Sequence, residues 1–329
     1  MMLVGVWNID NLLYISWKFS ISSVICWTII NILITSLILL ILLINHIFHV
    51  YTLADKEYRV PVNTGDIVLI TGASSGLGKS FMDQMISKKV KKIILIDKVR
   101  PDQEYFNGSF TELLFYQCDL SEKDSITSIM TKILEDLNER GEYITICINN
   151  AGIRGSGSLL SMDDRDFRSV FEVNTLSHTY IMKKVLQNYV NQIIPTYGKH
   201  RISVVSVASV LGYIAPKDLS AYSASKAAVI QVHEALRKEL SNFSEIRLLL
   251  ITTGQLTSNM FRDVIPPREF LAPIINHEEL AKRMVEKIDI GQEGSLSYPS
   301  YAKYLPLLKI MPLFIQDICR KFSKMDEQI

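Results

Sequence analysis

The most prominent pattern along the chain is an uninterrupted apolar segment near its start. Residues 19–54 contain no Asp, Glu, Lys or Arg, and residues 21–44 are dominated by Ile and Leu. About 20 apolar residues cross the hydrocarbon core of a bilayer. A cleaved signal peptide, the main alternative, would have a basic start, a shorter apolar run and a small-residue cleavage site. The pattern therefore predicts a retained transmembrane anchor over residues 19–50.

The segments that flank this anchor give weaker signals. Residues 1–18 are mostly apolar, and we expect them to lie in the headgroup layer or to pair with the anchor as a hairpin. Their aromatic side chains suit a membrane interface: Trp7, Tyr14 and Trp17. Lys18 precedes the anchor, whereas Lys56 and Arg59 follow it in a linker over residues 51–64. This bias slightly favours a single-pass protein whose main domain faces the cytosol.

After Pro61, short apolar runs alternate with stretches of helical periodicity. The apolar runs cover residues 67–71, 93–97, 113–117, 144–149, 202–207 and 246–251. The helical stretches cover residues 77–88, 122–138, 165–189, 221–240 and 277–288. Strands that alternate with helices predict an α/β fold, a doubly wound parallel sheet of the Rossmann type with helices on both faces. We expect one such domain over residues 65–300, followed by an amphipathic extension over residues 301–329.

Charge and cysteine content narrow the function classes. The 329 residues contain 35 Lys and Arg against 34 Asp and Glu, which gives a formal net charge of +1. No basic stripe stands out, so nucleic acid is not an expected partner. The four cysteines are scattered without C-x-x-C spacing. We therefore expect no disulfide framework, no metal site, and a reducing compartment for the main domain.

A glycine-rich turn follows the first predicted strand and opens the first predicted helix. Residues 71–78 read Thr-Gly-Ala-Ser-Ser-Gly-Leu-Gly. Glycines let the backbone turn tightly and approach a pyrophosphate, which the free N–H groups of a helix N-terminus attract. Asp97 ends the second strand, where a carboxylate accepts hydrogen bonds from ribose hydroxyls. These features favour dinucleotide binding by the following turn residues: Gly72, Ser74, Ser75, Gly76, Leu77 and Gly78.

A second run of small residues, Asn149-Asn150-Ala151-Gly152, closes the fourth predicted strand. Small residues there let the backbone come close to a ligand or to a neighbouring helix. Taken alone, such a run is more often a plain turn. Ligands bind at the carboxyl ends of strands in open parallel sheets, so the position favours cofactor contacts for Asn150, Ala151 and Gly152.

Tyr222 and Lys226 form the pattern with the most specific chemistry. They are four positions apart in a predicted helix, so they project from one face, one turn apart. A free phenol has a pKa of about 10. A nearby ammonium favours the phenolate and lowers this pKa toward the working range of a general acid/base. An ordinary amphipathic helix also carries such a pair by chance, so the neighbouring motifs have to decide between the two interpretations.

These motifs agree in order and spacing with one family. From about residue 65 to about residue 298 the chain resembles the short-chain dehydrogenases/reductases, specifically their one-domain NAD(P)-dependent branch. The matching elements are the glycine turn, Asp119 in Cys-Asp-Leu, the Asn-Asn-Ala-Gly run, Asn174 in Phe-Glu-Val-Asn, Ser209 thirteen residues before Tyr222, and Lys226. The resemblance implies a Rossmann-type fold, oxidoreductase activity and an NAD or NADP cofactor.

The resemblance also implies a role for each of these residues. Tyr222 would protonate a carbonyl oxygen during reduction or deprotonate an alcohol during oxidation. Lys226 would lower the pKa of Tyr222 and hold the nicotinamide ribose, and Ser209 would hydrogen-bond the substrate oxygen. Asn174 would hold the water of a proton relay behind Lys226, and Asp119 would lie on the adenine side. These roles fit hydride transfer, which leaves charge on an oxygen that a positioned donor neutralises.

The cofactor preference rests on a few positions. Family members usually carry Pro-Gly after the sixth strand, whereas this chain has Thr at the first of these positions and Gly254 at the second. Gly254 and Thr257 are still expected to meet the nicotinamide carboxamide. Asp97 favours NAD, because a carboxylate repels the 2′-phosphate of NADP. The non-basic Ser75 agrees with this preference, whereas Lys98 and Arg100 soften it.

An anchor on such a core resembles the membrane-bound branch that handles steroids, retinoids and other lipid alcohols or ketones. Residues 301–322 mix apolar and basic side chains, as in a helix that lies on a membrane or lines a lipid access. Packing against its own domain is the alternative. The loop over residues 255–272 is expected to cover the pocket with these apolar side chains: Phe261, Ile265, Pro266, Pro267 and Phe270.

The sequence thus predicts a membrane-anchored oxidoreductase that transfers a hydride between NAD(P)(H) and a lipophilic alcohol or carbonyl. The alternative is a cofactor-binding scaffold that organises a membrane or lipid-droplet surface without chemistry. The full set of catalytic-type residues counts against this alternative. The endoplasmic reticulum or a lipid droplet is the favoured location, with the mitochondrial membrane left open. Homo-oligomerisation, the substrate and the reaction direction are left open as well.

Overall fold

The computed structural model describes residues 9–54, 61–106, 110–155, 157–266, 268–269 and 272–327, in two compact units that divide between residues 56 and 57. The first unit contains one helix, α1 (Ile9–Ala54). Within it Ser22–Ile44 has a mean hydropathy of 2.6 and exposed side chains, which suits a bilayer span of 23 residues. Residues 9–17 continue this helix and do not fold back as a hairpin. Trp7 and residues 55–60 of the expected linker lie outside the described residues.

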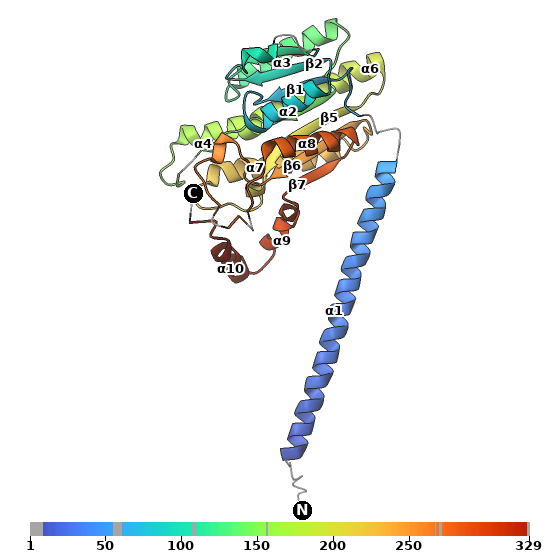
Figure 1. Ribbon diagram of the computed structural model, residues 1–329, viewed down its shortest axis with the longest axis vertical. Helices are drawn as coiled ribbons and strands as arrows, with labels where there is room; N and C mark the ends of the chain where they lie inside the picture. Colours follow the sequence, from blue (N-terminus) through green and yellow to red (C-terminus); the bar gives the residue numbers. More distant parts are fainter. Residues whose placement is uncertain are drawn as a thin grey trace, which may run out of the picture. The chain divides into compact units, whose positions relative to one another are not determined.

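The second unit is built on a parallel sheet, which confirms the predicted fold class (Figure 1). Its strands are β1 (Ile67–Thr71), β2 (Lys92–Asp97), β3 (Glu112–Gln117), β4 (Ile146–Asn149), β5 (Ile202–Ser209), β6 (Ile246–Thr253) and β7 (Gly294–Tyr298). They lie in the order β3-β2-β1-β4-β5-β6-β7, and every neighbouring pair is parallel. The order reverses between β1 and β4. In such sheets the crevice at the carboxyl ends of these strands is the place where a ligand binds.

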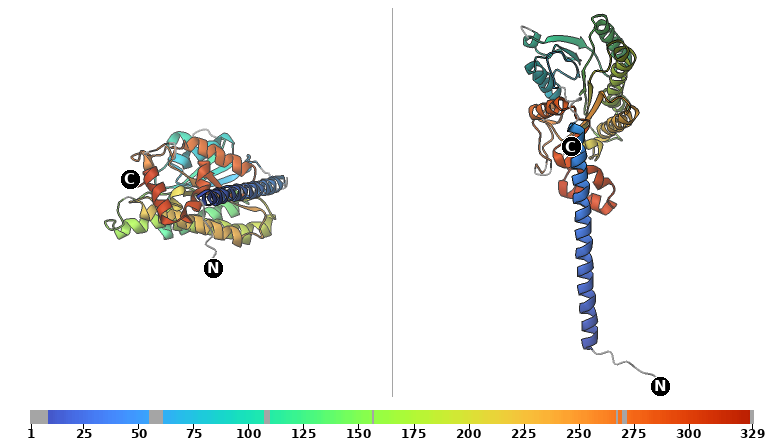
Figure 2. Two further views of the ribbon diagram at one scale, coloured as in Figure 1. Left: turned by 90° about the horizontal axis from the view of Figure 1, so that it is seen from below. Right: turned by 90° about the vertical axis from the view of Figure 1, so that its right-hand side faces the viewer.

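Helices cover both faces of the sheet (Figure 2). The face with Val68 and Ile70 packs against α2 (Gly76–Ser87) and α8 (His277–Asp289). The opposite face, with Leu69, packs against α3 (Lys123–Glu139), α5 (Ser177–Asn188) and α7 (Ser220–Glu239). Because both faces are covered, the strands in the middle of the sheet are fully buried and read as continuous apolar runs.

The long helix predicted over residues 165–189 is interrupted. The structure has α4 (Asp164–Phe171), a π-helical segment (Glu172–Leu176) and then α5. A second π-helical segment (Tyr189–Ile193) leads into the short α6 (Ile194–Tyr197). The first interruption contains the fully buried Asn174. Such π-helical turns occur frequently at functional sites.

The C-terminal segment folds as short pieces instead of one amphipathic helix. A 3₁₀ turn (Ser300–Tyr304) leads into α9 (Leu305–Lys309) and α10 (Leu313–Ser323). Polar contacts attach it to the rest of its unit, because Arg320 Nη2 donates to the carbonyl oxygen of Ala215 at 3.0 Å. The N–H of Lys217 likewise donates to Asp326 Oδ1 at 2.9 Å. Residues 328–329 lie outside the described residues.

Candidate active site

A cavity of about 970 Å³ opens at the carboxyl ends of the strands and brings most of the predicted site residues together. It extends from the glycine turn, past Tyr222, to the C-terminal segment. The predicted residues that line it are Gly72, Ser75, Gly76, Leu77, Asp97, Asn150, Ala151, Gly152, Ser209, Tyr222, Lys226 and Gly254. Ser74, Gly78, Asp119, Asn174 and Thr257 are not in its wall. Thr257 instead faces the start of α8, where its hydroxyl accepts the N–H of His277 at 3.3 Å.

The glycine turn and the run after β4 form one tightly packed structure. Gly72 has a φ of 65°, and a Cβ added to it would lie 2.8 Å from Ala151 Cα. A Cβ on Gly78 would lie 2.1 Å from the Gly72 carbonyl oxygen. Asn150 Nδ2 donates to the carbonyl oxygens of Thr71 and Gly72 at 3.1 and 3.0 Å. Asn150 therefore supports the turn as well as lining the cavity, and the turn leaves its main chain free to approach a pyrophosphate.

Asp97 is held at the cavity wall by the loop beside it. Its Oδ2 accepts the N–H of Ser74 at 3.0 Å, and its Oδ1 accepts the N–H of Val99 at 3.3 Å. Lys98, one of the two residues expected to soften the NAD preference, forms an ion pair with Asp119 at 2.8 Å. Burial alone raises the pKa of Asp119, but hydrogen bonds from Lys98 and Ser121 bring it below its usual value.

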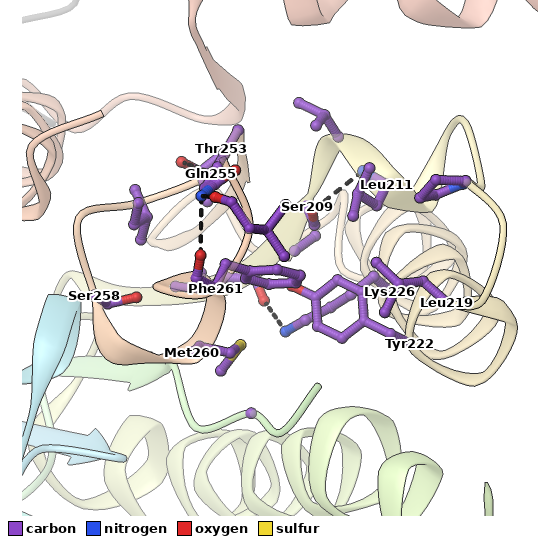
Figure 3. Close-up of a pocket in the computed structure, with 18 of the residues that line it drawn as sticks. Ser209, Leu211, Leu219, Tyr222, Lys226, Thr253, Gln255, Ser258, Met260 and Phe261 are labelled. Atoms are coloured by element: carbon purple, nitrogen blue, oxygen red, sulfur yellow. Dashed lines mark hydrogen bonds between the residues drawn. The ribbon is translucent and has the colours of Figure 1, made fainter. Parts of the chain in front are cut away.

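Tyr222, Ser209 and Lys226 lie together at the middle of the cavity (Figure 3). Burial raises the pKa of Tyr222 to about 12, and a side-chain hydrogen bond with Ser209 opposes this rise. Lys226 Nζ lies 6.0 Å from the centre of the Tyr222 ring and donates to the carbonyl oxygen of Val207 at 2.9 Å. Burial lowers the pKa of Lys226 to about 8. The pKa of Tyr222 is thus shifted opposite to our expectation, because burial of the phenol outweighs its hydrogen bond with Ser209.

Asn174 lies behind this group and joins α7 to the loop after β4. Its Oδ1 accepts the N–H of Ile153 at 2.8 Å, and its Nδ2 donates to the Ile153 carbonyl at 2.9 Å and to Ser225 Oγ at 2.9 Å. A Cβ on Gly152 would lie 3.3 Å from Asn174 Oδ1 and 3.5 Å from Lys226 Nζ. Ser225 was not among the predicted site residues. Only its place within Tyr222-Ser223-Ala224-Ser225-Lys226 could have indicated it.

The loop after β6 covers Tyr222 in part, as expected. Phe261 packs edge-to-face on the Tyr222 ring, with ring centres 5.4 Å apart. Arg154 Nη1 and Nη2 donate to the Asp263 carboxylate at 2.7 and 3.0 Å, and Arg154 also lies 5.3 Å from the Phe261 ring centre. Pro266 lines the cavity, whereas Ile265 is exposed, which corrects its predicted role. Pro267 and Phe270 lie outside the described residues.

Comparison with known proteins agrees with this geometry. The family model described as short chain dehydrogenase matches residues 66–269. The chain belongs to the short-chain dehydrogenase family. It is 31% identical to the protein named uncharacterized oxidoreductase TDA5 of Saccharomyces cerevisiae, over 95% of this chain and 91% of that protein. It is 28% identical to the estradiol 17-beta-dehydrogenase 11 of Homo sapiens, over 79% of this chain and 84% of that protein.

The fold of the second unit is also that of solved members of the family. A short-chain dehydrogenase from Sphingobium yanoikuyae in complex with NADPH matches with a TM-score of 0.62 and 24% identity, over 77% of this chain and 96% of that one. The family model and the fold together show a short-chain dehydrogenase/reductase, a family whose members typically use NAD(P)(H). The glycine turn fits this cofactor. The turn is too tightly packed for a Cβ at Gly72 or Gly78, and without these side chains its main chain can approach a pyrophosphate.

Proposed function

We propose that this dehydrogenase is anchored in a membrane by residues 22–44 and acts on a lipophilic alcohol or carbonyl, with Tyr222 as the general acid/base. The observation that carries the proposal is the apolar end of the cavity, which is continuous with the wall that holds Tyr222. Its apolar lining includes Leu211, Ile214, Leu219, Met260, Phe261, Leu305 and Leu308. An apolar wall favours an apolar substrate, because burying it removes its surface from water. A relative named for estradiol, which is lipophilic, supports the same substrate class.

The catalytic chemistry follows from the Tyr222 group. When bound, NAD(P)(H) supplies or accepts the hydride. A phenol with a pKa of about 12 stays protonated at neutral pH, so Tyr222 is a proton donor for a carbonyl oxygen that gains charge. Ser209, bonded to the same phenol, offers a second hydrogen bond to that oxygen. In the oxidation direction the phenol has to lose its proton, which its raised pKa opposes and a nearby Lys226 ammonium would assist.

The remaining residues orient this group and the cofactor. The links from Asn174 to Ser225 and Ile153 hold α7 against the loop after β4, at the side of Lys226. We propose that Asn174 positions the relay water behind Lys226. We also propose NAD as the preferred cofactor, because Asp97 lines the cavity while Lys98 is paired with Asp119. The cofactor is cytosolic in this proposal, and the membrane is that of the endoplasmic reticulum or a lipid droplet.

Turnover of a panel of lipid alcohols and ketones with NAD(H) and NADP(H) tests the proposal. Tyr222→Phe removes the proton carrier but keeps the ring, so kcat should fall by roughly 10²–10⁴-fold. The matched control is Tyr301→Phe, which changes a cavity tyrosine away from the Ser209 pair and should leave kcat within a few-fold. Cofactor binding measured by fluorescence shows that both variants are folded. Unchanged turnover in Tyr222→Phe would overturn its assignment, and absence of turnover in the parent protein would favour a scaffold.

A further inference from the structure

The outward side of the C-terminal segment is unusually apolar. Six large side chains there are between 51% and 76% exposed. They are Tyr304, Leu307, Ile310, Leu313, Phe314 and Ile318, and we name this set the docking face. Soluble monomers rarely expose a contiguous apolar area of this kind unless something binds it. We therefore expect another molecule to cover the docking face.

The inward side of the same two helices belongs to the cavity. Leu305 and Leu308 of α9 line it, as do Cys319 and Phe322 of α10, although Phe322 is also 56% exposed. In each helix the inward pair is spaced by three residues, which places it on one side. Figure 1 shows α9 and α10 next to one another beyond β7. The same two helices therefore carry part of the docking face and part of the cavity wall.

The charges around the docking face select a lipid surface as its occupant. Residues 301–322 contain four basic residues and one acidic residue. Arg320 is paired with Asp326 at 2.7 Å, whereas Lys303, Lys309 and Lys321 lie exposed beside the apolar side chains. Apolar side chains with lysines at their edge are typical of helices that lie in the interface of a membrane containing anionic lipids.

The chain that joins α1 to the catalytic unit is short. Helix α1 ends at Ala54, and Val62 is already buried in the catalytic unit, where its N–H donates to Asp289 Oδ1 at 2.8 Å. Eight residues of chain extend at most roughly 28 Å. If α1 spans a bilayer, the catalytic unit stays at its surface, and the effective concentration of lipid around the docking face is high.

We propose that the docking face lies in the headgroup layer of the membrane that α1 enters, and that the cavity receives its substrate from the lipid on the side where α9 and α10 line it. The membrane contact follows from the exposed side chains and is independent of the reaction. The substrate route rests on the proposed function. The two are separable by experiment, because lipid contact is measurable without turnover.

The test uses the full-length chain in lipid nanodiscs of phosphatidylcholine and phosphatidylserine, with or without brominated acyl chains. Cys26 and Cys319 are replaced by Ser and Ala, and Cys118 and Cys147, which are buried, are kept. An environment-sensitive dye is then attached to Leu313→Cys. The matched control is Phe110→Cys, which is as exposed but precedes β3 at the opposite edge of the sheet. We expect brominated lipid to quench the dye several-fold more at position 313 than at position 110.

Two further variants connect this contact to the route. Lys309→Glu with Lys321→Glu should reduce quenching at position 313, because it reverses the attraction to anionic lipid. Leu313→Glu with Phe314→Glu should raise the KM for a long-chain alcohol several-fold and leave the KM for a short water-soluble alcohol unchanged. Equal quenching at both labelled positions would overturn the membrane contact. The dye emission could also shift to the blue without quenching, and only in discs that hold two copies of the protein. That result would show that a second copy covers the docking face, and it would overturn the membrane contact too.

Discussion

The two ends of the cavity differ in the groups that line them and in how these groups are held. At the cofactor end, main-chain atoms and small side chains are held by close packing and hydrogen bonds, as in the contacts of Gly72, Gly78 and Asn150. At the substrate end, the wall consists of side chains from the loop after β6 and from α9 and α10. Those segments are held partly by polar contacts near the surface, such as Arg154 with Asp263.

The difference shows what each end has to do. A dinucleotide presents the same pyrophosphate and ribose to every member of the family, and main-chain N–H groups at a helix start recognise them. The substrate end has to match one apolar molecule and let it in and out. A loop over Tyr222 and a C-terminal segment with an exposed apolar side suit that task. Substitutions at the first end should therefore change cofactor binding, and substitutions at the second should change the KM for the substrate.

The largest expected effect in this comparison comes from Gly78→Ala. The added Cβ would lie 2.1 Å from the Gly72 carbonyl oxygen, so the turn must shift. Such overpacking costs about 1–3 kcal/mol. Where the cofactor-bound form of the turn bears this cost, the dissociation constant of NAD(H) rises by roughly 5- to 150-fold. Gly65→Ala is the control, because its nearest new contact is a side-chain oxygen, Asn63 Oδ1, at 3.2 Å. Fluorescence titration with NADH measures both, and unaltered binding in Gly78→Ala would show that the cofactor end tolerates movement.

A smaller effect is expected from Asp97→Asn. The amide keeps an acceptor for the N–H of Ser74 but loses the charge that disfavours a 2′-phosphate. The ratio of kcat/KM with NAD to kcat/KM with NADP should fall by on the order of tenfold, or about 1.4 kcal/mol. Asp102→Asn, an exposed acid in the segment after β2, should leave the ratio unchanged. A preference for NADP in the parent protein would contradict the role assigned to Asp97.

The sequence predicted the central fold because the strands there are buried on both faces. The runs that became β1, β2, β4, β5 and β6 are rich in Ile, Leu and Val, so they could be identified without knowledge of their neighbours. β7 was not predicted. Its sequence, Gly-Ser-Leu-Ser-Tyr, lies at the edge of the sheet and is only partly buried, so it shows no apolar run. The π-helical turn at Asn174 likewise leaves no trace in helical periodicity.

The same reasoning explains which site residues the sequence could indicate. Gly72 and Gly78 could be identified because the tight turn requires glycine at these positions. Tyr222 and Lys226 could be identified because they are four residues apart on one helix. Thr257 was predicted to meet the cofactor, but its N–H donates to the Ile275 carbonyl at 2.9 Å and its hydroxyl faces α8. The course of a loop depends on distant packing, which no local pattern records.

The smallest expected effect concerns Arg154 and Asp263, which are 109 residues apart in the chain. Their ion pair and the contact of Arg154 with Phe261 hold the loop after β6 over Tyr222. Arg154→Ala and Asp263→Ala should each raise the KM for a lipophilic substrate by a few-fold at most, because Asp263 is exposed and such pairs are weak. The double variant should add little to either single one, and the charge exchange Arg154→Asp with Asp263→Arg should recover part of the loss. Binding of NADH should be the same in all four, since the pair serves the substrate end. A change in the dissociation constant of NADH that equals the change in KM would show that the two ends are not separate.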